Sequence, residues 1–242
     1  FEELAKLSTG HLWMQLYVFR DREMTKDWLQ RAKESGYEAL CITLDSIWPP
    51  KRERNIRNDY QRTRSVNYAS SGSGGSSREQ GGRSQPGGGS PASTWKDLEW
   101  IKSLTDLPIV AKGIMTGDDA ELCAQIGIDA VLVSNHGGRH LDNTLATIEV
   151  LPEVVDAVKG RAEILHDGGV MRGADVVKAL ALGAKAVFIG RPIYWGLAVN
   201  GHEGLIRVME ILREEMEITM VKCGRATIEN IDSSVVVKAP PL

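Results

Sequence analysis

A histidine and an arginine separated by two glycines occur in the segment Ser134–Asp142, as His136-Gly137-Gly138-Arg139. A histidine titrates near neutral pH and can take a proton from a substrate, and the planar fork of an arginine matches a carboxylate. Because glycine lacks a Cβ, Gly137 and Gly138 let a substrate or cofactor approach the backbone. The spacing therefore predicts a general base beside a carboxylate clamp, although a solvated loop with a capping His136 gives the same short pattern.

This segment directly follows an apolar run that is typical of a buried strand. Similar runs recur along the chain, and they predict strands near 12–18, 38–44, 108–112, 129–134, 163–166 and 184–189. Amphipathic stretches between them predict helices after Thr25, after Thr94, and near 117–126, 147–159, 173–182 and 202–216. Gly127 and Gly183 occupy positions where a helix end favours a positive φ. This alternation predicts βαβ units and a parallel sheet.

The number of units defines the expected fold class. We expect an α/β fold of the TIM (β/α)8-barrel type, with only six βα units evident in this chain. A complete barrel needs eight units, so two are expected to be missing at the amino terminus. The missing strands could come from another chain or from a longer protein of which this chain is a part. Alternatively, the six-stranded sheet could close in an altered way, and the sequence leaves these three possibilities open. In each case residues 1–242 are interpreted as a single partial barrel domain.

A Gly/Ser-rich segment interrupts this domain at about 65–92. It contains Gly-Ser-Gly-Gly-Ser and Gly-Gly-Gly-Ser pieces and almost no apolar side chains that a core could bury. Such a composition predicts a flexible connector. An engineered linker and a natural mobile loop both fit it.

Composition excludes several classes of function. The 242 residues are 42% hydrophobic and 25% charged, with a net charge of −3, so we expect no nucleic-acid partner. Apolar runs are too short to span a bilayer, and no membrane partner is expected. Cys41, Cys123 and Cys223 are far apart and lack metal-ligand spacing, so no metal site is predicted. The same cysteines are better interpreted as reduced, partly buried side chains, which favours an intracellular protein.

Six motifs in order give the chain a family resemblance. Ser134–Asp142 resembles the signature of the FMN-dependent α-hydroxy acid oxidases and dehydrogenases of the glycolate oxidase type, and the likeness covers nearly all of 1–64 and 93–237. The other motifs are Trp13–Tyr17, Ile42–Asp45 followed by Arg52, Ile109–Gly113, Asp167–Val170 and Ile189–Pro192. The animal hydroxyacid oxidases appear most similar. The resemblance implies FMN-dependent oxidation of a small or medium 2-hydroxy acid to the 2-oxo acid.

The resemblance also implies a role for each motif residue. His136 would be the catalytic base, Asp45 would stabilise its imidazolium, and Tyr17 would hydrogen-bond the substrate. Arg52 and Arg139 would hold the substrate carboxylate. The residues implied to bind FMN are Gln15, Thr43, Lys112, Ser134, Asp167, Gly168, Gly169, Gly190 and Arg191. Of these, Lys112 would stabilise charge on the reduced ring, and Gly169, Gly190 and Arg191 would hold the phosphate.

Besides the absence of the family's first two barrel strands, two features depart from the family pattern. Met171 stands where many members carry a phosphate-binding arginine, and Arg172 is its neighbour. The loop after the second strand is rich in Gly and Ser and would make a poor lid. The alternative to an enzyme is a catalytically incomplete or engineered fragment that serves as a folding or binding scaffold. Other FMN- or phosphate-binding barrels share the glycine turns but lack the His136 and Arg139 pair.

The resemblance finally implies partners and a location. These are a 2-hydroxy acid substrate, O2 or another electron acceptor, and further copies of the chain, which form a tetramer in the family. A second chain that supplies the missing strands is also considered. The expected location is peroxisomal or cytoplasmic, although the final residues are not a Ser-Lys-Leu tail.

Overall fold

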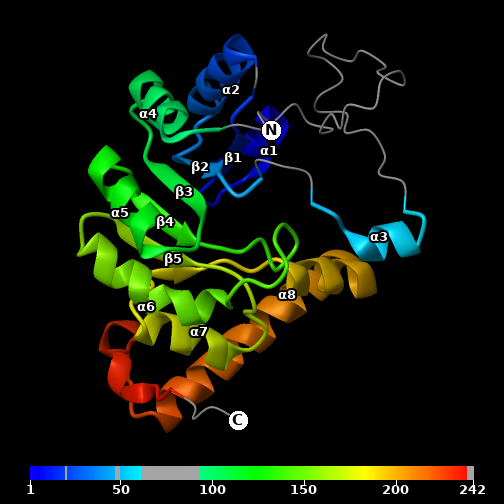
Figure 1. The fold of residues 1–242 in the computed structure, drawn as a ribbon. Coiled ribbons are helices and arrows are strands. Elements are labelled where there is room, and N and C mark those ends of the chain that lie inside the picture. Colours follow the sequence, from blue (N-terminus) through cyan, green and yellow to red (C-terminus); the bar gives the residue numbers. More distant parts are fainter. Residues whose placement is uncertain (20, 47–49, 61–92, 239–242) are drawn as a thin grey trace. The chain divides into compact units, whose positions relative to one another are not determined.

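A computed structural model describes residues 1–19, 21–46, 50–60 and 93–238. The chain forms two units (Figure 1), and each is described by itself below. Unit 1 comprises Phe1–Lys112 with Arg139–Leu141, and unit 2 comprises Gly113–Gly138 with Asp142–Leu242. The predicted connector at 65–92 lies outside the described residues.

Unit 1 contains three parallel strands in chain order. Strands β1 (Trp13–Tyr17), β2 (Ala39–Thr43) and β3 (Ile109–Ile114) pair side by side, and β3 enters unit 2 after Lys112. The helices are α1 (Glu2–Leu7), α2 (Arg22–Glu34), α3 (Glu53–Arg57) and α4 (Trp95–Leu104). Every residue of β2 is buried, as a strand between two neighbours requires. The predicted strands 12–18, 38–44 and 108–112 are thus confirmed to within two residues, whereas α1 and α3 were not predicted.

The start of α2 differs from the prediction. Asp21, not Thr25, is the N-cap, because its carboxylate accepts hydrogen bonds from the N–H groups of Glu23 and Met24 at 3.0 and 3.2 Å. Thr25 lies buried inside the helix, where its hydroxyl donates to the Asp21 carbonyl. The Thr94 prediction is confirmed, since Thr94 and Asp97 form a capping box at the start of α4.

Unit 2 continues the alternation. Its strands are β4 (Ala130–Val133), β5 (Glu163–His166) and β6 (Ala186–Val187), again parallel and in chain order. Its helices are α5 (Gly117–Ile126), α6 (Thr147–Val158), α7 (Gly173–Ala181) and α8 (Arg191–Lys222), followed by the short helices η2 (Ile228–Asn230) and η3 (Ser233–Val235). Figure 1 shows α7 against α8, and α5 also packs on α6.

Two expectations for unit 2 need correction. The strand expected at 184–189 is only two residues long. The helix expected near 202–216 is the second segment of α8 (Arg191–Lys222); the first segment, which ends where the backbone leaves helical geometry at Asn200 and Gly201, was not predicted. Gly127 and Gly183 have the predicted positive φ, at 77° and 105°. None of the described helices combines the length and apolarity that crossing a membrane requires.

The contact between α7 and α8 depends on Gly173. A Cβ added to Gly173 would lie 2.1 Å from the backbone nitrogen of Met216 and 2.5 Å from the carbonyl carbon of Glu215. Backbone cannot yield as a side chain can, so overpacking is costly here. We expect Gly173→Ala to lower the free energy of unfolding by about 3 kcal/mol, the upper end of usual overpacking costs. Urea denaturation measures this change.

Gly10→Ala is the matched control for Gly173→Ala. The nearest atom to a Cβ at Gly10 is the Ser8 Oγ at 3.9 Å, which is ordinary contact. Equal unfolding free energies for the two variants would contradict the close α7–α8 packing.

Candidate functional site

The loop after β4 carries His136 in a left-handed turn. His136, Gly137 and Gly138 all have positive φ, at 55°, 65° and 72°. The buried Ser134 hydroxyl accepts the His136 N–H at 3.2 Å, and the Gly138 N–H donates to the Asn135 carbonyl at 3.0 Å. A positive φ is uncommon for a residue with a side chain, so these bonds fix the position of His136 against backbone strain.

The two glycines serve different needs in this turn. A Cβ on Gly137 would lie 3.1 Å from an Arg191 Nη atom, so the guanidinium lies directly beside the Gly137 backbone. A Cβ on Gly138 would meet nothing within 4 Å, and only its positive φ favours glycine. Unit 2 thus brings the predicted base loop and the predicted phosphate arginine together.

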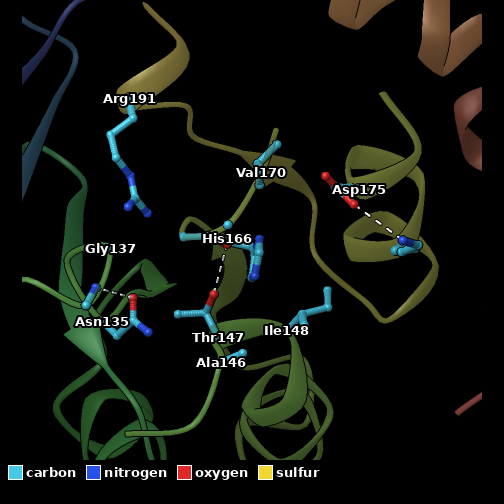
Figure 2. Close-up of a pocket in the computed structure, with 13 residues that line it drawn as sticks. Asn135, Gly137, Ala146, Thr147, Ile148, His166, Val170, Asp175 and Arg191 are labelled. Atoms are coloured by element: carbon cyan, nitrogen blue, oxygen red, sulfur yellow. Dashed lines mark hydrogen bonds and ion pairs between the residues drawn. The ribbon is translucent and has the colours of Figure 1, made fainter. Parts of the chain in front are cut away.

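A second glycine turn follows β5. Gly168 and Gly169 have φ values of 93° and 75°, and a Cβ on Gly168 would lie 2.7 Å from the Thr147 Oγ1 atom. The Thr147 hydroxyl donates to the Gly168 carbonyl at 3.2 Å, as Figure 2 shows. Glycine is therefore required at 168 both by conformation and by close approach, and the turn leaves its amides accessible to a ligand.

A pocket of about 350 Å³ lies between these turns in unit 2 (Figure 2). It is lined by residues from the β4 and β5 loops and from the starts of α6, α7 and α8: Asn135, Gly137, Gly138, Ala146, Thr147, Ile148, His166, Gly168, Gly169, Val170, Asp175, Lys178 and Arg191. Gly168, Gly169 and Arg191 are thus three predicted FMN-binding residues that line one cavity. Ser134, Asp167 and Gly190 belong to the same loops but do not line it.

His166 is a pocket residue that sequence analysis missed. It ends β5, its side chain is 2% exposed, and neither ring nitrogen has a hydrogen-bond partner among the described residues. Burial lowers the pKa of His166, and the nearby Asp167 carboxylate offsets part of that effect. The sequence offered one indication of this residue, because His166 is an ionisable residue directly after the apolar pair Ile164-Leu165.

The pocket's donors fit a phosphate group. A Cβ on Gly168 would clash with the Thr147 Oγ1 atom, and the Arg191 guanidinium lies beside Gly137. The buried His166 imidazole has no hydrogen-bond partner among the described residues. Arg172 does not contribute, because its guanidinium pairs with Glu215 at 2.7 Å outside the pocket. Among the residues implied for FMN, Gly190 caps α8 and Arg191 opens it, which is where a helix attracts an anion.

In unit 1 the predicted flavin-binding residues share one edge of the sheet. Tyr17 pairs in register with Thr43, and Thr43 pairs with Lys112, at the carboxyl ends of the three strands. The Gln15 amide donates to the Thr43 hydroxyl at 2.8 Å. Parallel strands present their carboxyl ends to a common binding edge in α/β folds. The structure therefore brings Gln15, Tyr17, Thr43 and Lys112 together.

The remaining predicted residues of unit 1 lie in loops. Asp45 follows β2 and is partly exposed, Arg52 is the N-cap residue of α3, and Arg139 is exposed. A ring nitrogen of His140 lies within 4.8 Å of an Asp45 carboxylate oxygen. His140 was quoted in the motif but given no role, so this neighbour of Asp45 is new. At that separation, Asp45 is placed to attract a protonated imidazole.

Comparisons with known proteins show the family to which the chain is similar. The sequence matches the FMN-dependent dehydrogenase family over residues 1–238. Human 2-hydroxyacid oxidase 1 is 44% identical over 249 residues, which cover 99% of this chain and 67% of that protein. The L-lactate oxidase of Nostoc sp. is 44% identical over 241 residues, covering 95% and 65%.

Solved structures of mandelate oxidase are also similar to this chain. Mandelate oxidase with 3,3-difluoro-2-hydroxy-3-phenylpropionic acid superimposes with a TM-score of 0.80 at 36% identity, covering 96% of this chain and 64% of that one. The chain thus spans about two thirds of the length of the relatives it matches. Its fold class is that of the family, a TIM-type α/β arrangement with six parallel strands described here. The chain is a member of the FMN-dependent dehydrogenase family.

Proposed function

We propose that this chain acts in the FMN-dependent oxidation of a small or medium 2-hydroxy acid to the 2-oxo acid. The observation that carries the proposal is the family match over 1–238, within which His136 and Arg139 occupy the Ser134–Asp142 segment. Relatives named 2-hydroxyacid oxidase and L-lactate oxidase support the substrate class. FMN, when bound, supplies an acceptor for a hydride equivalent at N5.

The chain's own residues have separate tasks in this proposal. His136 removes a proton from the substrate, either from the α-hydroxyl or from the α-carbon, and Asp45 stabilises the resulting imidazolium. Arg52 and Arg139 hold the planar carboxylate through their guanidinium forks. Tyr17 donates a hydrogen bond to the substrate.

A second group of residues binds the cofactor in this proposal. Lys112 stabilises negative charge at the flavin ring, and Gln15, Thr43 and Ser134 hydrogen-bond the ring. Asp167 contacts the ribityl chain. The phosphate contacts are assigned to Gly168, Gly169, Gly190 and Arg191, of which three line the unit 2 pocket.

Partners and location follow from the relatives. We propose O2 or another oxidant as the electron acceptor and a homo-oligomer as the working assembly. A peroxisomal (S)-2-hydroxyacid oxidase of Arabidopsis thaliana is 44% identical over 96% of this chain, which supports a peroxisomal rather than a cytoplasmic location.

Flavin absorbance tests the proposed function. The purified chain should take up FMN, turn yellow and be bleached anaerobically by glycolate, lactate or a longer 2-hydroxy acid. The two enantiomers of lactate give the matched control, because one enantiomer should reduce the flavin much faster than the other. Protein that stays colourless with added FMN would favour the scaffold alternative and count against the enzyme.

Arg139→Lys should act mainly on substrate binding. Lysine keeps the positive charge but cannot form the two parallel hydrogen bonds of a guanidinium. We expect the substrate Kd to rise by about tenfold, since hydrogen bonds to charged groups contribute roughly 1.5–3 kcal/mol. Reduction rates measured against substrate concentration give this Kd.

Arg207→Lys provides the control for Arg139→Lys. Arg207 is an exposed residue of α8 that pairs with Glu210, and it belongs to neither binding group. A similar rise in Kd for both variants, or for neither, would contradict the carboxylate role of Arg139.

A further inference from the structure

His166 is a buried imidazole that the proposed reaction does not use. Both of its ring nitrogens lack a hydrogen-bond partner among the described residues, although the side chain is 2% exposed. Leu165 and Ile164 precede it in β5, and both are buried apolar residues. An apolar side chain at 166 would fill the same space without the desolvation cost of two unsatisfied nitrogens. The position of His166 on the pocket wall suggests that a ligand satisfies it (Figure 2).

The rest of the pocket selects an anion. The Gly168-Gly169 turn has successive positive φ values, and the first turn of α6, a helix of twelve residues, borders the same cavity at Ala146–Ile148. First-turn amides attract negative charge, and part of this attraction is met by the Glu149 carboxylate, which accepts the Ala146 N–H at 3.0 Å. The Arg191 guanidinium lies at the pocket's other side, beside Gly137.

Asp175 is the carboxylate that lines the pocket, and it is already neutralised. One of its oxygens accepts the N–H groups of Met171 and Arg172 at 3.1 and 3.0 Å. The other pairs with the Lys178 ammonium group at 3.3 Å (Figure 2). Asp175 therefore does not cancel the attraction of the pocket for an anion.

We propose that His166 is an anion-binding residue, whose imidazole donates a hydrogen bond to a phosphate-type dianion held by Arg191 and the Gly168-Gly169 turn. The terminal phosphate of FMN and free inorganic phosphate share this chemistry. With FMN as the source, the inference rests on the proposed function and adds a phosphate ligand to it. With free phosphate as the source, the pocket is a separate anion site.

Binding should be coupled to proton uptake. Burial lowers the pKa of His166 and so favours its neutral form, whereas a bound dianion favours the imidazolium. The charged groups around it are Asp167 in its own loop, Glu149 capping α6, Asp175 and Lys178 on α7, and Arg191 at the start of α8. Because the anion raises the pKa of His166, affinity should fall as the pH rises through the pKa of the complex.

Calorimetric titration of the full chain with FMN, riboflavin and inorganic phosphate tests the proposal. His166→Leu should weaken FMN or phosphate binding by about tenfold or more, because hydrogen bonds to charged groups are strong, and should leave riboflavin binding unchanged. His166→Gln, which keeps a donor, should recover part of the affinity. Titrations in two buffers with different ionisation enthalpies should show proton uptake for wild type and none for His166→Leu.

Thermal melting separates a ligand role from a structural one. Without ligand, His166→Leu should melt at or above the wild-type temperature, because it removes two unsatisfied buried nitrogens; a structural histidine would instead lose stability. The control is His202→Leu, at an exposed histidine of α8 outside the pocket, which should change no affinity.

The phosphate titration identifies the source of the anion. Displacement of phosphate by FMN but not by riboflavin assigns the pocket to the cofactor's phosphate. Phosphate that binds alongside FMN, and is weakened by His166→Leu, assigns it to a free anion. If the chain bound phosphate but took up no FMN, the proposed function would be contradicted and the anion site would still be supported. Unchanged affinities for both ligands in a folded His166→Leu variant would overturn the role of His166.

Discussion

His136→Gln is expected to slow anaerobic flavin reduction by roughly 10²- to 10⁴-fold, the usual contribution of a positioned general base. Glutamine approximates the size of the imidazole but cannot accept the proton. FMN binding should survive, because the pocket residues assigned to the phosphate do not include His136. Stopped-flow reduction with glycolate, lactate and a longer 2-hydroxy acid measures the effect.

His202→Gln is the matched control for His136→Gln. His202 is exposed on α8 and lies in none of the assigned groups, so its variant should be reduced at the wild-type rate. The His136 N–H bond to Ser134 uses only the backbone, so the turn should persist in the glutamine variant. If His136→Gln were reduced as fast as wild type by all three acids, His136 would not be the base.

The elements were predictable where burial alone determines them. Ala130–Val133 and Glu163–His166 appear as strands within one residue of the expected bounds, because short apolar runs have few other places to be buried. The cap at Thr94 and the positive φ of Gly127 also followed from local chemistry. These features need no knowledge of distant contacts.

The errors came from competition between neighbouring cap residues and from contacts between separated segments. Thr25 suits an N-cap by type, but Asp21 lies four residues earlier and its carboxylate accepts the N–H groups of Glu23 and Met24, so α2 begins one turn sooner. The last helical element has an additional segment before the bend at Asn200 and Gly201, and Gly196 and Gly204 allow its two segments to approach closely. Strand β6 is short, and within unit 2 it pairs with β5 through two residues.

The candidate site was predicted in parts. Glycine at 168 and 169 indicated a tight turn, and the structure adds the reason, a close approach of Thr147. His166 was missed because nothing in its local sequence distinguishes a strand end from a pocket wall. Only the packing of α6 against β5 and the residues that line the pocket show that its nitrogens are buried without partners among the described residues.

Arg191→Ala should weaken FMN binding by about 10- to 100-fold, while riboflavin binding stays unchanged. A charge-assisted hydrogen bond to a phosphate contributes roughly 1.5–3 kcal/mol, and tenfold in Kd corresponds to about 1.4 kcal/mol. Arg191 opens α8 and lines the pocket beside Gly137, so no other guanidinium lining the described pocket can replace it. Fluorescence titration with FMN and riboflavin measures both affinities.

Arg172→Ala is the matched control, because it removes a nearby guanidinium that pairs with Glu215 and does not line the pocket. It should leave FMN affinity at the wild-type level. Equal loss in both variants would indicate a general effect of positive charge, and equal retention would remove Arg191 from the phosphate site. Combining Arg191→Ala with His166→Leu adds a further constraint, since two residues that bind one phosphate should show non-additive losses. Strictly additive losses would mean that the two side chains contribute to phosphate binding independently.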